Sequence, residues 1–396
     1  MKFNWYFRIK EAFIAQLNKK GGPAMINEEQ LVAEFLELVQ IDSESKNERQ
    51  IADTLLKKFK ELGLDAFEDD TQSKTGHGAG NIIATLPATT KGIDPIYFTC
   101  HMDTVKPGNG IKPSIKNGKV QSDGTTILGA DDKAGIAAFL GAIRVLKEQG
   151  TSHGQIQFIV TIGEEVGLVG ASAMAPENLK SQYGFALDSS GNVGEIVVAA
   201  PTQAKVIAKV YGKTAHAGVA PEKGVSAITI AAKAIAQMPL GRIDEETTAN
   251  IGIINGGVAT NIVCDFVEVI AEARSLVADK MQKQAQTMKA AFEDAANEMG
   301  GHVDVNIDVL YASYKLGDGD KVVEVAKTAI KAVGLEPKLV TSGGGSDANV
   351  FSGYGVPTVN LAVGYEDIHT TNEKMPIENL VKLAEVIASI VNTVAK

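Results

Sequence analysis

Five apolar stretches of the chain each lead directly into acidic residues or a histidine. The stretches are YFTC, TTILGA, FIVTIG, YGFALD and PTVNLAV, and the polar residues at or after their ends are His101 with Asp103, Asp131, Glu164 with Glu165, Asp188, and His369. Imidazole and carboxylate groups together suit zinc, manganese or cobalt, and because the set contains no thiolate, a structural zinc site is not expected. The residue types therefore predict a catalytic metal centre.

The number of ligands is sufficient for two metal ions. Three carboxylates and two histidines can hold two ions if one carboxylate bridges them. Three carboxylates and one hydroxide nearly neutralise two divalent ions. Such a centre also accounts for the adjacent pair Glu164 and Glu165, because a metal ion offsets the charge of one glutamate and leaves the other free.

Glu164 and Glu165 are expected to have different roles. Adjacent side chains on an extended segment point to opposite sides, so one can ligate a metal while the other faces the water bound there. A metal ion lowers the pKa of its water from about 15.7 toward about 7, and a nearby carboxylate can accept the proton. The spacing His101-x-Asp103 likewise suits a ligand with a carboxylate behind it, which fixes the histidine tautomer.

Each of these residues has a plainer interpretation when taken alone. His101 could be a hydrogen-bonded core histidine, and Asp131 could belong to a helix-capping cluster. The glutamate pair could start a solvated turn, and Asp188 could be an ordinary turn residue. Coincidence at five strand ends is improbable, which favours the joint metal-site hypothesis.

The elements around these residues must bring them together. GNIIATL, DPIYFTC, QIQFIVTIG, YGFALD and PTVNLAV have the composition of buried strands. Helices are expected around Glu28–Gln40, Glu48–Leu62 and Lys133–Glu148. This alternation predicts an α/β sheet layered by helices. In open α/β sheets, ligands bind outside the carboxyl ends of the strands, so the five strand ends are expected to meet in one crevice.

A different rhythm of elements begins near Thr202. QAKVIAKVYG predicts a strand, VSAITIAAKAIAQM a helix, TANIGIING and NIVCDFVEVIAEARSL paired strands, Asp279–Glu298 a helix, and HVDVNIDVL a strand. The order β-α-β-β-α-β is that of a ferredoxin-like module. We therefore expect an inserted α+β domain at 200–312, and a split α/β domain formed by 25–199 and 313–396.

Composition argues against several other classes of function. The formal charge of −10 disfavours binding to nucleic acid or to an anionic membrane, because both need basic patches. Cys100 and Cys264 are the only cysteines, so a disulfide framework is not expected and a cytoplasmic location fits. No apolar run is long enough to predict a transmembrane helix.

Residues 1–24 form a basic, amphipathic segment that Gly21-Gly22-Pro23 separates from the rest of the chain. Arg8, Lys10 and Glu11 interrupt any signal-peptide core. We expect an N-terminal extension outside the fold, with a membrane-surface or partner helix as the alternative.

Several motifs in combination resemble the M20 family of dinuclear zinc peptidases. They are His101-Met102-Asp103-Thr104, GADDKAG, GEEVGLVGA, FALD and Asp367-Ile368-His369, and the likeness extends from about Met25 to the C-terminus. The resemblance implies a zinc-exopeptidase-like catalytic domain with a mixed sheet, which binds two Zn²⁺ per subunit, with Mn²⁺ or Co²⁺ as alternatives.

The resemblance also implies roles for individual residues at the metal centre. Asp131 corresponds to the bridging ligand. Glu165 and His369 would complete one zinc site, and His101 and Asp188 the other. Glu164 corresponds to the general base, and Asp103 to the acid that orients His101.

In the inserted module, the resemblance implies a lid and dimerisation domain and hence a homodimer. KTAHAG supplies His216, NGGVATNIV supplies Asn261, and EARS supplies Arg274 as contacts to the substrate carbonyl or carboxylate. His216 would reach the active site of the partner subunit. The stretch GGGSDANVF, with Gly344 and Asp347, corresponds to a substrate-side loop. Taken alone, His216 also suits a turn, and Asn261 and Arg274 also suit a polar surface.

The expected function is hydrolysis of short peptides by a cytoplasmic metallo-aminopeptidase, of tripeptides by resemblance. One alternative is an M20-type amidohydrolase that removes an acyl group from an amino acid. An alternative from another class is a non-catalytic metal or peptide binder on the same fold, which intact Glu164 and Asp103 disfavour, because a binder does not need a free base beside its ligands.

Overall fold

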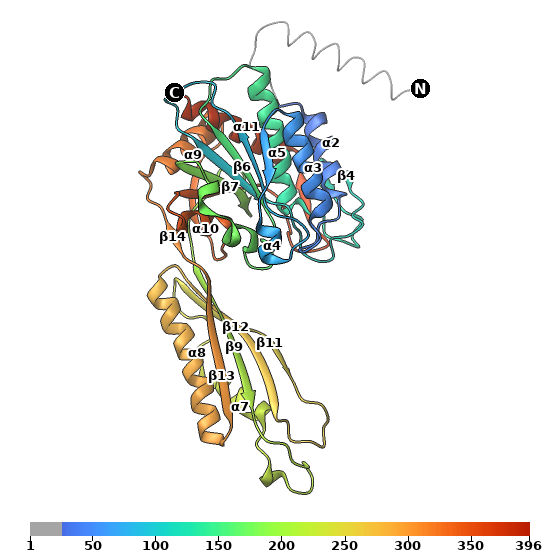
Figure 1. The fold of residues 1–396 in the computed structure, drawn as a ribbon, viewed down its shortest axis with the longest axis vertical. Helices are drawn as coiled ribbons and strands as arrows, with labels where there is room; N and C mark the ends of the chain where they lie inside the picture. The colour runs from blue at the N-terminus through green and yellow to red at the C-terminus, as the bar shows by residue number, and fades with distance from the viewer. Residues whose placement is uncertain (1–25) are drawn as a thin grey trace. The chain divides into compact units, whose positions relative to one another are not determined.

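The computed structural model describes residues 26–396, so the expected extension at 1–24 lies outside the described residues. The described chain divides into two compact units, drawn in Figure 1. The first comprises the described residues up to Ile196 together with Lys321–Lys338 and Asn360–Lys396. The second comprises Val197–Asp320 and Leu339–Val359. In both, each strand predicted above is present, with ends shifted by a few residues.

The larger sheet has nine strands in the order β1-β2-β6-β3-β7-β16-β8-β14, and β15 pairs with β8. Strand β3 is parallel to β6 and β7, whereas β2 is antiparallel to β1 and β6, which confirms the mixed α/β sheet. Every residue of β3 and β6 is buried, as their continuous apolar sequences require. The strands are β1 (Asp65–Glu68), β2 (Ile82–Leu86), β3 (Ile96–His101), β6 (Ile156–Thr161), β7 (Tyr183–Ser189), β8 (Glu195–Ala200), β14 (Tyr314–Lys315), β15 (Lys338–Thr341) and β16 (Thr358–Ala362).

Helix α5 (Ala130–Glu148) is the central helix of the first unit. It packs on β3 and β7 and against two further helices, α2 (Glu28–Val39) and α11 (Ile377–Val394). The ring of Phe139 on α5 stacks on Phe158 of β6 at 3.8 Å, and Phe59 packs edge-on against both. Phe59 belongs to α3 (Arg49–Glu61), so α3 and α5 cover the same face of the sheet.

Short elements complete the first unit. The sequence did not predict them, because segments of three to five residues carry too little periodicity to be recognised. They are α4 (Thr71–Thr75), α6 (Val169–Ala173), η1 (Pro176–Asn178), and a small sheet of β4 (Ser114–Lys116), β5 (Lys119–Gln121) and β17 (Lys374–Pro376). The longer α9 (Lys321–Ala332) packs on β7 and α11.

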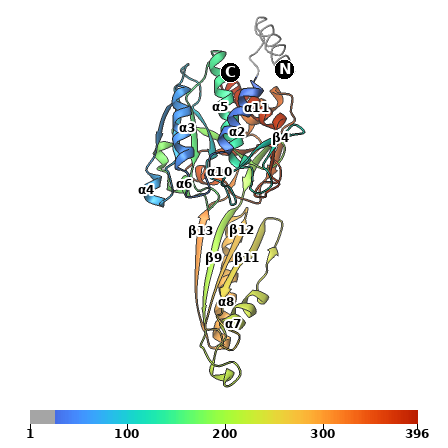
Figure 2. The same cartoon turned by 90° about the vertical axis from the view of Figure 1, so that its right-hand side faces the viewer.

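The second unit contains a five-stranded sheet in the order β10-β11-β12-β9-β13. Figure 2 shows β13, β9, β12 and β11 side by side, with α8 packed along them. Without the short β10, the element order is the predicted β-α-β-β-α-β. The elements are β9 (Thr202–Tyr211), η2 (Pro221–Lys223), α7 (Ala227–Gln237), β10 (Gly241–Arg242), β11 (Thr247–Gly256), β12 (Phe266–Ser275), α8 (Ala278–Met299), β13 (His302–Tyr311) and α10 (Asp347–Gly353).

Strict alternation along β9 builds the core of the second unit. Ala204, Val206, Ala208 and Val210 are fully buried, and the residues between them are partly or fully exposed. The buried side chains pack with those of β12, α7 and α8 in one hydrophobic cluster. The period of two therefore places both helices on one face of this sheet.

Two histidines in stretches of loop-like sequence are buried. The exposed fraction is 6% for His77 and 5% for His153, whereas His302 is exposed. A loop residue can be buried when its hydrogen bonds are made within the protein, and local sequence does not reveal such partners. Cys100 and Cys264 are free and buried. Among the described residues, no helix is both long and apolar enough to cross a membrane.

Candidate metal centre and active site

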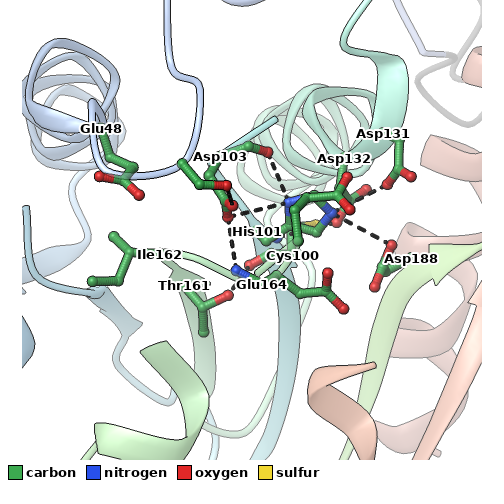
Figure 3. A network of polar contacts seen from close by, with 12 residues as sticks. Glu48, Cys100, His101, Asp103, Asp131, Asp132, Thr161, Ile162, Glu164 and Asp188 are labelled. Atoms are coloured by element: carbon green, nitrogen blue, oxygen red, sulfur yellow. Dashed lines mark hydrogen bonds and ion pairs between the residues drawn. The ribbon is translucent and has the colours of Figure 1, made fainter. Parts of the chain in front are cut away.

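Five elements of the first unit bring the predicted ligands together. His101 is the last residue of β3, Asp188 lies near the end of β7, and Asp131 lies in the first turn of α5. Glu165 follows β6, and His369 lies in the loop between β16 and β17. Figure 3 shows His101 at the middle of this group, with Asp131 and Asp188 facing its ring.

The carboxylate of Asp131 faces two histidines at once. Its Oδ1 is 3.1 Å from Nε2 of His101, and its Oδ2 is 3.1 Å from Nε2 of His369. The backbone of Asp131 departs from helical angles, with φ −81° and ψ 104°, although the residue lies inside the helical segment. This extended backbone directs the side chain away from the helix, and each oxygen is available to a different partner.

Each histidine has a second carboxylate within reach. Nε2 of His101 is 3.6 Å from Oδ1 of Asp188, and Nε2 of His369 is 3.0 Å from Oε1 of Glu165. The ring of His101 is almost completely buried, whereas the side chain of His369 is 49% exposed. The group is therefore closed on the His101 side and reached by solvent on the His369 side.

The electrostatics of the group favour positive charge at its centre. Hydrogen bonds with Asp131 and Glu165 raise the pKa of His369 to about 10. Burial opposes protonation of His101, but hydrogen bonds with Asp103, Asp131 and Asp188 raise its pKa well above the ordinary value. Burial would raise the pKa of Asp131, yet hydrogen bonds with the two histidines lower it.

The donor set fits metal ions. Ligand atoms of His101, Asp131 and Glu165 lie within 4.8 Å of one another, and so do those of His101, Asp132 and Asp188. A bridging carboxylate that faces two imidazoles, with one further carboxylate on each side, matches the ligand types and numbers that a pair of zinc, manganese or cobalt ions takes. The protonated imidazoles would give up their protons on metal binding.

Glu164 lies at the start of a loop rather than on an extended segment. The chain bends directly after β6, and the expectation that strand geometry alone separates Glu164 from Glu165 is therefore wrong. Their separation comes from partners instead. The backbone N–H of Glu164 donates to Oδ1 of Asp103 at 2.9 Å, while the side chain of Glu165 pairs with His369.

Asp103 contacts His101 mainly through its backbone. Nδ1 of His101 is 2.9 Å from the carbonyl oxygen of Asp103 and 3.6 Å from carboxylate Oδ1. The fully buried carboxylate also accepts a hydrogen bond from Oγ of Ser45 at 2.6 Å. Asp103 thus joins the histidine to the backbone of Glu164, a link drawn in Figure 3.

Three further residues near the centre were not singled out from the sequence. Asp132 is fully buried and accepts the backbone N–H of His101 at 3.3 Å. Burial and the nearby Asp188 raise its pKa well above the ordinary value. Asp132 could have been noticed in the sequence because it follows Asp131 directly. Nothing in the local sequence distinguishes Ser45 or Glu373 from ordinary surface residues.

Glu373 holds the turn that leads into α5. Its carboxylate accepts the backbone N–H groups of Leu128, Gly129 and Asp131 at 2.8, 2.8 and 3.1 Å. The side chain is buried, and burial raises its pKa to about 7. A residue more than 240 positions away in sequence therefore fixes the backbone beside Asp131.

The five residues predicted to contact substrate lie in the second unit. His216 is exposed, its Nδ1 accepts the N–H of Gly218, and its segment is bonded to that of Asn261, whose carbonyl accepts the N–H of Ala217 at 2.9 Å. Arg274 on β12 pairs with both carboxylate oxygens of Glu272, at 2.9 and 3.0 Å.

The Gly344 loop lies near this arginine. Nη1 of Arg274 is 3.8 Å from where a Cβ on Gly344 would be. Asp347 is buried at the start of α10. The second unit therefore groups the predicted substrate residues in two places, one around His216 and one around Arg274.

The sequence of the chain matches a known family over most of its length. Residues 97–393 match the model of the peptidase family M20/M25/M40. The chain belongs to this family. As a family member, it is a hydrolase of peptide bonds.

Relatives of this M20-family chain match it nearly end to end. An uncharacterized protein of Bacillus subtilis, YqjE, is 64% identical over 372 residues, which cover 94% of this chain and 100% of that protein. Aminopeptidase PepT from Bacillus cereus, for which a crystal structure exists, is 66% identical in sequence to this chain, and the two structures superpose with a TM-score of 0.87. A tripeptidase from Staphylococcus aureus of known crystal structure is 49% identical in sequence, with a TM-score of 0.90. Each structure covers 94% of this chain and is itself covered completely.

Proposed function

We propose that this chain is a dinuclear metal-dependent aminopeptidase that releases the N-terminal residue of short peptides, and of tripeptides in particular. The substrate class is supported by the two solved relatives named aminopeptidase and tripeptidase, which match the chain over their whole lengths at 66% and 49% identity. Family membership supports peptide hydrolysis in general, and the names of these two relatives support tripeptides as the class of substrate.

The observation that carries the dinuclear proposal is the position of Asp131 between two imidazoles, with 3.1 Å on each side. In this proposal Asp131 would be shared by two ions, with Glu165 and His369 holding one of them and His101 and Asp188 holding the other. Zinc is the proposed metal, and the same donor set suits manganese or cobalt. When bound, such ions polarise a carbonyl group and make water more acidic.

Glu164 is the proposed general base. Its carboxylate takes a proton from the attacking water and later delivers it to the amine of the departing product. Its backbone is held by the carboxylate of Asp103, which also lies behind His101.

We propose that the peptide is contacted by His216, Asn261, Arg274, Gly344 and Asp347. Residues 200–312 are the proposed lid and dimerisation domain of a cytoplasmic homodimer.

The test is hydrolysis of a peptide panel by purified protein, before and after chelation. We expect chelation to abolish the release of free amino acid, and added Zn²⁺, Mn²⁺ or Co²⁺ to restore it. Elemental analysis of the active protein should give about two metal equivalents per subunit, as a shared carboxylate between two sites requires. Full activity in thoroughly metal-stripped protein would refute the metal dependence.

The panel also separates the alternatives. Di-, tri- and tetrapeptides with a free amino terminus are compared with the same tripeptide carrying an N-acetyl group and with N-acetyl amino acids. An aminopeptidase cleaves the free tripeptide and not its acetylated form. Preference for the N-acetyl amino acids would instead indicate a deacylase, and tight peptide binding without turnover would indicate a binder.

A further inference from the structure

A buried histidine and a buried glutamate form a pair next to the proposed active site. Nδ1 of His77 is 2.8 Å from Oε1 of Glu48, and the side chains are only 3% and 0% exposed. Neither residue belongs to the metal ligands. Burying two ionisable groups together costs free energy unless their polar atoms are satisfied, so the contacts of the pair indicate what it does.

The carboxylate of Glu48 is fully used in holding the chain around His77. Oε1 also accepts the backbone N–H of Lys46 at 2.8 Å, and Oε2 accepts the N–H of Gly78 at 3.0 Å. The residue after His77 is thus fixed by the same side chain that binds the ring. With the ring and its flanking peptide bonded to one carboxylate, the orientation of the imidazole is set.

The Cε1 end of the imidazole, next to the nitrogen that binds Glu48, lies against Gly163. A Cβ placed on Gly163 would lie 2.3 Å from Cε1 of His77, 2.9 Å from Nδ1 and 3.1 Å from Nε2. Gly163 has a φ of 57°, a left-handed conformation in which glycine is not strained. Gly163 is also the residue directly before Glu164, so the ring packs on the backbone that carries the proposed base.

A second contact to this backbone comes from Asp103, which is bonded to the same short segment of chain as Glu48. Asp103 accepts the N–H of Glu164 and is bonded in turn to Ser45, three residues before Glu48. The backbone of Ser45 donates to the carbonyl of Thr104 at 3.2 Å. Figure 3 shows Glu48 and Asp103 above Ile162 and Glu164 in this view. The peptide joining Gly163 to Glu164 is therefore contacted by His77 and by Asp103.

We propose that His77, oriented by Glu48, is a positioning residue that sets the direction of Glu164. The proposal rests on the proposed function, in which Glu164 is the base. A base must meet its proton within hydrogen-bond distance, and a displacement of about 1 Å can cost about 10²-fold in rate. The imidazole, held in place by Glu48, packs against Gly163 and restricts the positions that the Gly163 backbone can take.

The first test is a set of single variants assayed on a tripeptide. His77→Ala removes the ring that packs against Gly163, and we expect kcat to fall by about 10- to 100-fold. KM and metal content should be unchanged, because no ligand or substrate contact is removed. His77→Asn, which can still donate to Glu48, should retain more activity than His77→Ala.

The matched control is His153→Ala. His153 is a buried histidine of the same unit whose Nδ1 is bonded to the carbonyl of Gly154, away from the loop of Glu164. This variant should lose thermal stability much as His77→Ala does and keep the wild-type kcat. An equal loss of kcat in the control would show that general destabilisation, not positioning, is responsible.

A size exchange gives the sharper test. Gly163→Ala places a methyl group against the ring of His77 and should lower kcat. The double variant His77→Ala with Gly163→Ala opens space for that methyl group, so its kcat should exceed that of Gly163→Ala alone. If the two sites act independently, the losses multiply instead. A multiplied loss would overturn the proposal, and so would a wild-type kcat in folded, metal-loaded His77→Ala.

The outcome can be separated from a failure of the proposed function. If Glu164→Ala keeps the wild-type turnover, Glu164 is not the base and the proposed mechanism is wrong, whatever the His77 variants do. If Glu164→Ala is inactive while His77→Ala is fully active, only the positioning role is wrong. Should His77→Ala not fold, the single variants Gly163→Ala and His77→Asn decide, because both keep at position 77 a side chain that can bond to Glu48. A wild-type kcat in both variants would overturn the proposal.

Discussion

Asp131 has a central position in the proposed metal site, because it contacts histidines from two different elements. Its oxygens face His101 and His369 from opposite ends, and the buried carboxylate remains ionised because both imidazoles compensate its charge. The adjacent glutamates are tolerated for a similar reason. Glu165 pairs with His369, and Glu164 has its backbone fixed by Asp103. At the scale of residues, the function therefore depends on which partner each carboxylate has.

The two neighbouring glutamates should fail differently when replaced. Glu164→Ala removes the proposed base and no ligand, so turnover should fall by about 10²- to 10⁴-fold with metal content kept. Glu165→Ala removes a proposed ligand and should lower metal occupancy. Elemental analysis after gel filtration, beside kcat, distinguishes them, and equal metal loss in both variants would contradict the assignment.

Replacing Asp103 should lower both the affinity for metal and the activity that depends on Glu164. Asp103→Asn removes the negative charge behind His101 and alters the acceptor for the N–H of Glu164, so metal affinity and activity should each fall by about 10- to 100-fold. Ser45→Ala removes one hydrogen bond to the same carboxylate and should cost less. Metal titration and kcat give the comparison, and an unchanged Asp103→Asn would place this residue outside the site.

At the scale of elements, the two ends of the loop after β6 are joined by a backbone hydrogen bond from Gly170 to Ile162 and by the side-chain amide of Asn81. Asn81 is fully buried, its Oδ1 accepts the N–H of Ile162 at 3.1 Å, and its Nδ2 donates to the carbonyl of Gly170 at 2.9 Å. The same Nδ2 also reaches Asp69 at 3.1 Å. Both proposed functional glutamates lie between the two anchored ends.

Asn81→Ala should therefore loosen this loop. The loss of a buried partner costs about 1–3 kcal/mol of unfolding free energy, and exchange of the amide hydrogens of 162–170 should become faster than elsewhere in the sheet. The control is Asn392→Ala, whose amide bonds only to the carbonyl of Ala388 in its own helix. Thermal unfolding and hydrogen exchange are the measurements, and unchanged exchange in the loop would contradict the anchoring role.

At the scale of the whole molecule, we propose different roles for the two units. The first unit contains the proposed ligand set and the proposed base. The second carries His216, an exposed histidine that we propose serves the active site of the partner subunit. A symmetric dimer makes such a contribution reciprocal.

Mixing two inactive variants tests the shared site. In a mixed dimer of Glu164→Ala and His216→Ala, one site carries both defects and the other combines intact Glu164 with intact His216. Random exchange makes about half of the dimers mixed, so about a quarter of the normal activity should return. Native mass spectrometry verifies the exchange. No recovery after verified exchange would show that His216 acts within its own subunit, if at all.

Most of the longer strands, several of the larger helices and the types of residue at the strand ends could be predicted from the sequence. These features are local: continuous burial of β3 and β6 requires an apolar run, and alternation along β9 requires a period of two. Polar residues that end a buried strand are conspicuous for the same reason, which is why His101 and Asp188 could be singled out.

Which side chains contact one another became known only from the tertiary structure. Glu373 reaches the turn before α5 across more than 240 residues, and the loop-like sequence around His77 conceals a buried ring that contacts Gly163. The bend after β6 replaced the extended geometry expected for Glu164. Such contacts depend on distances between segments remote in sequence, and those distances are set by the packing of the whole sheet and its helices, not by any local pattern.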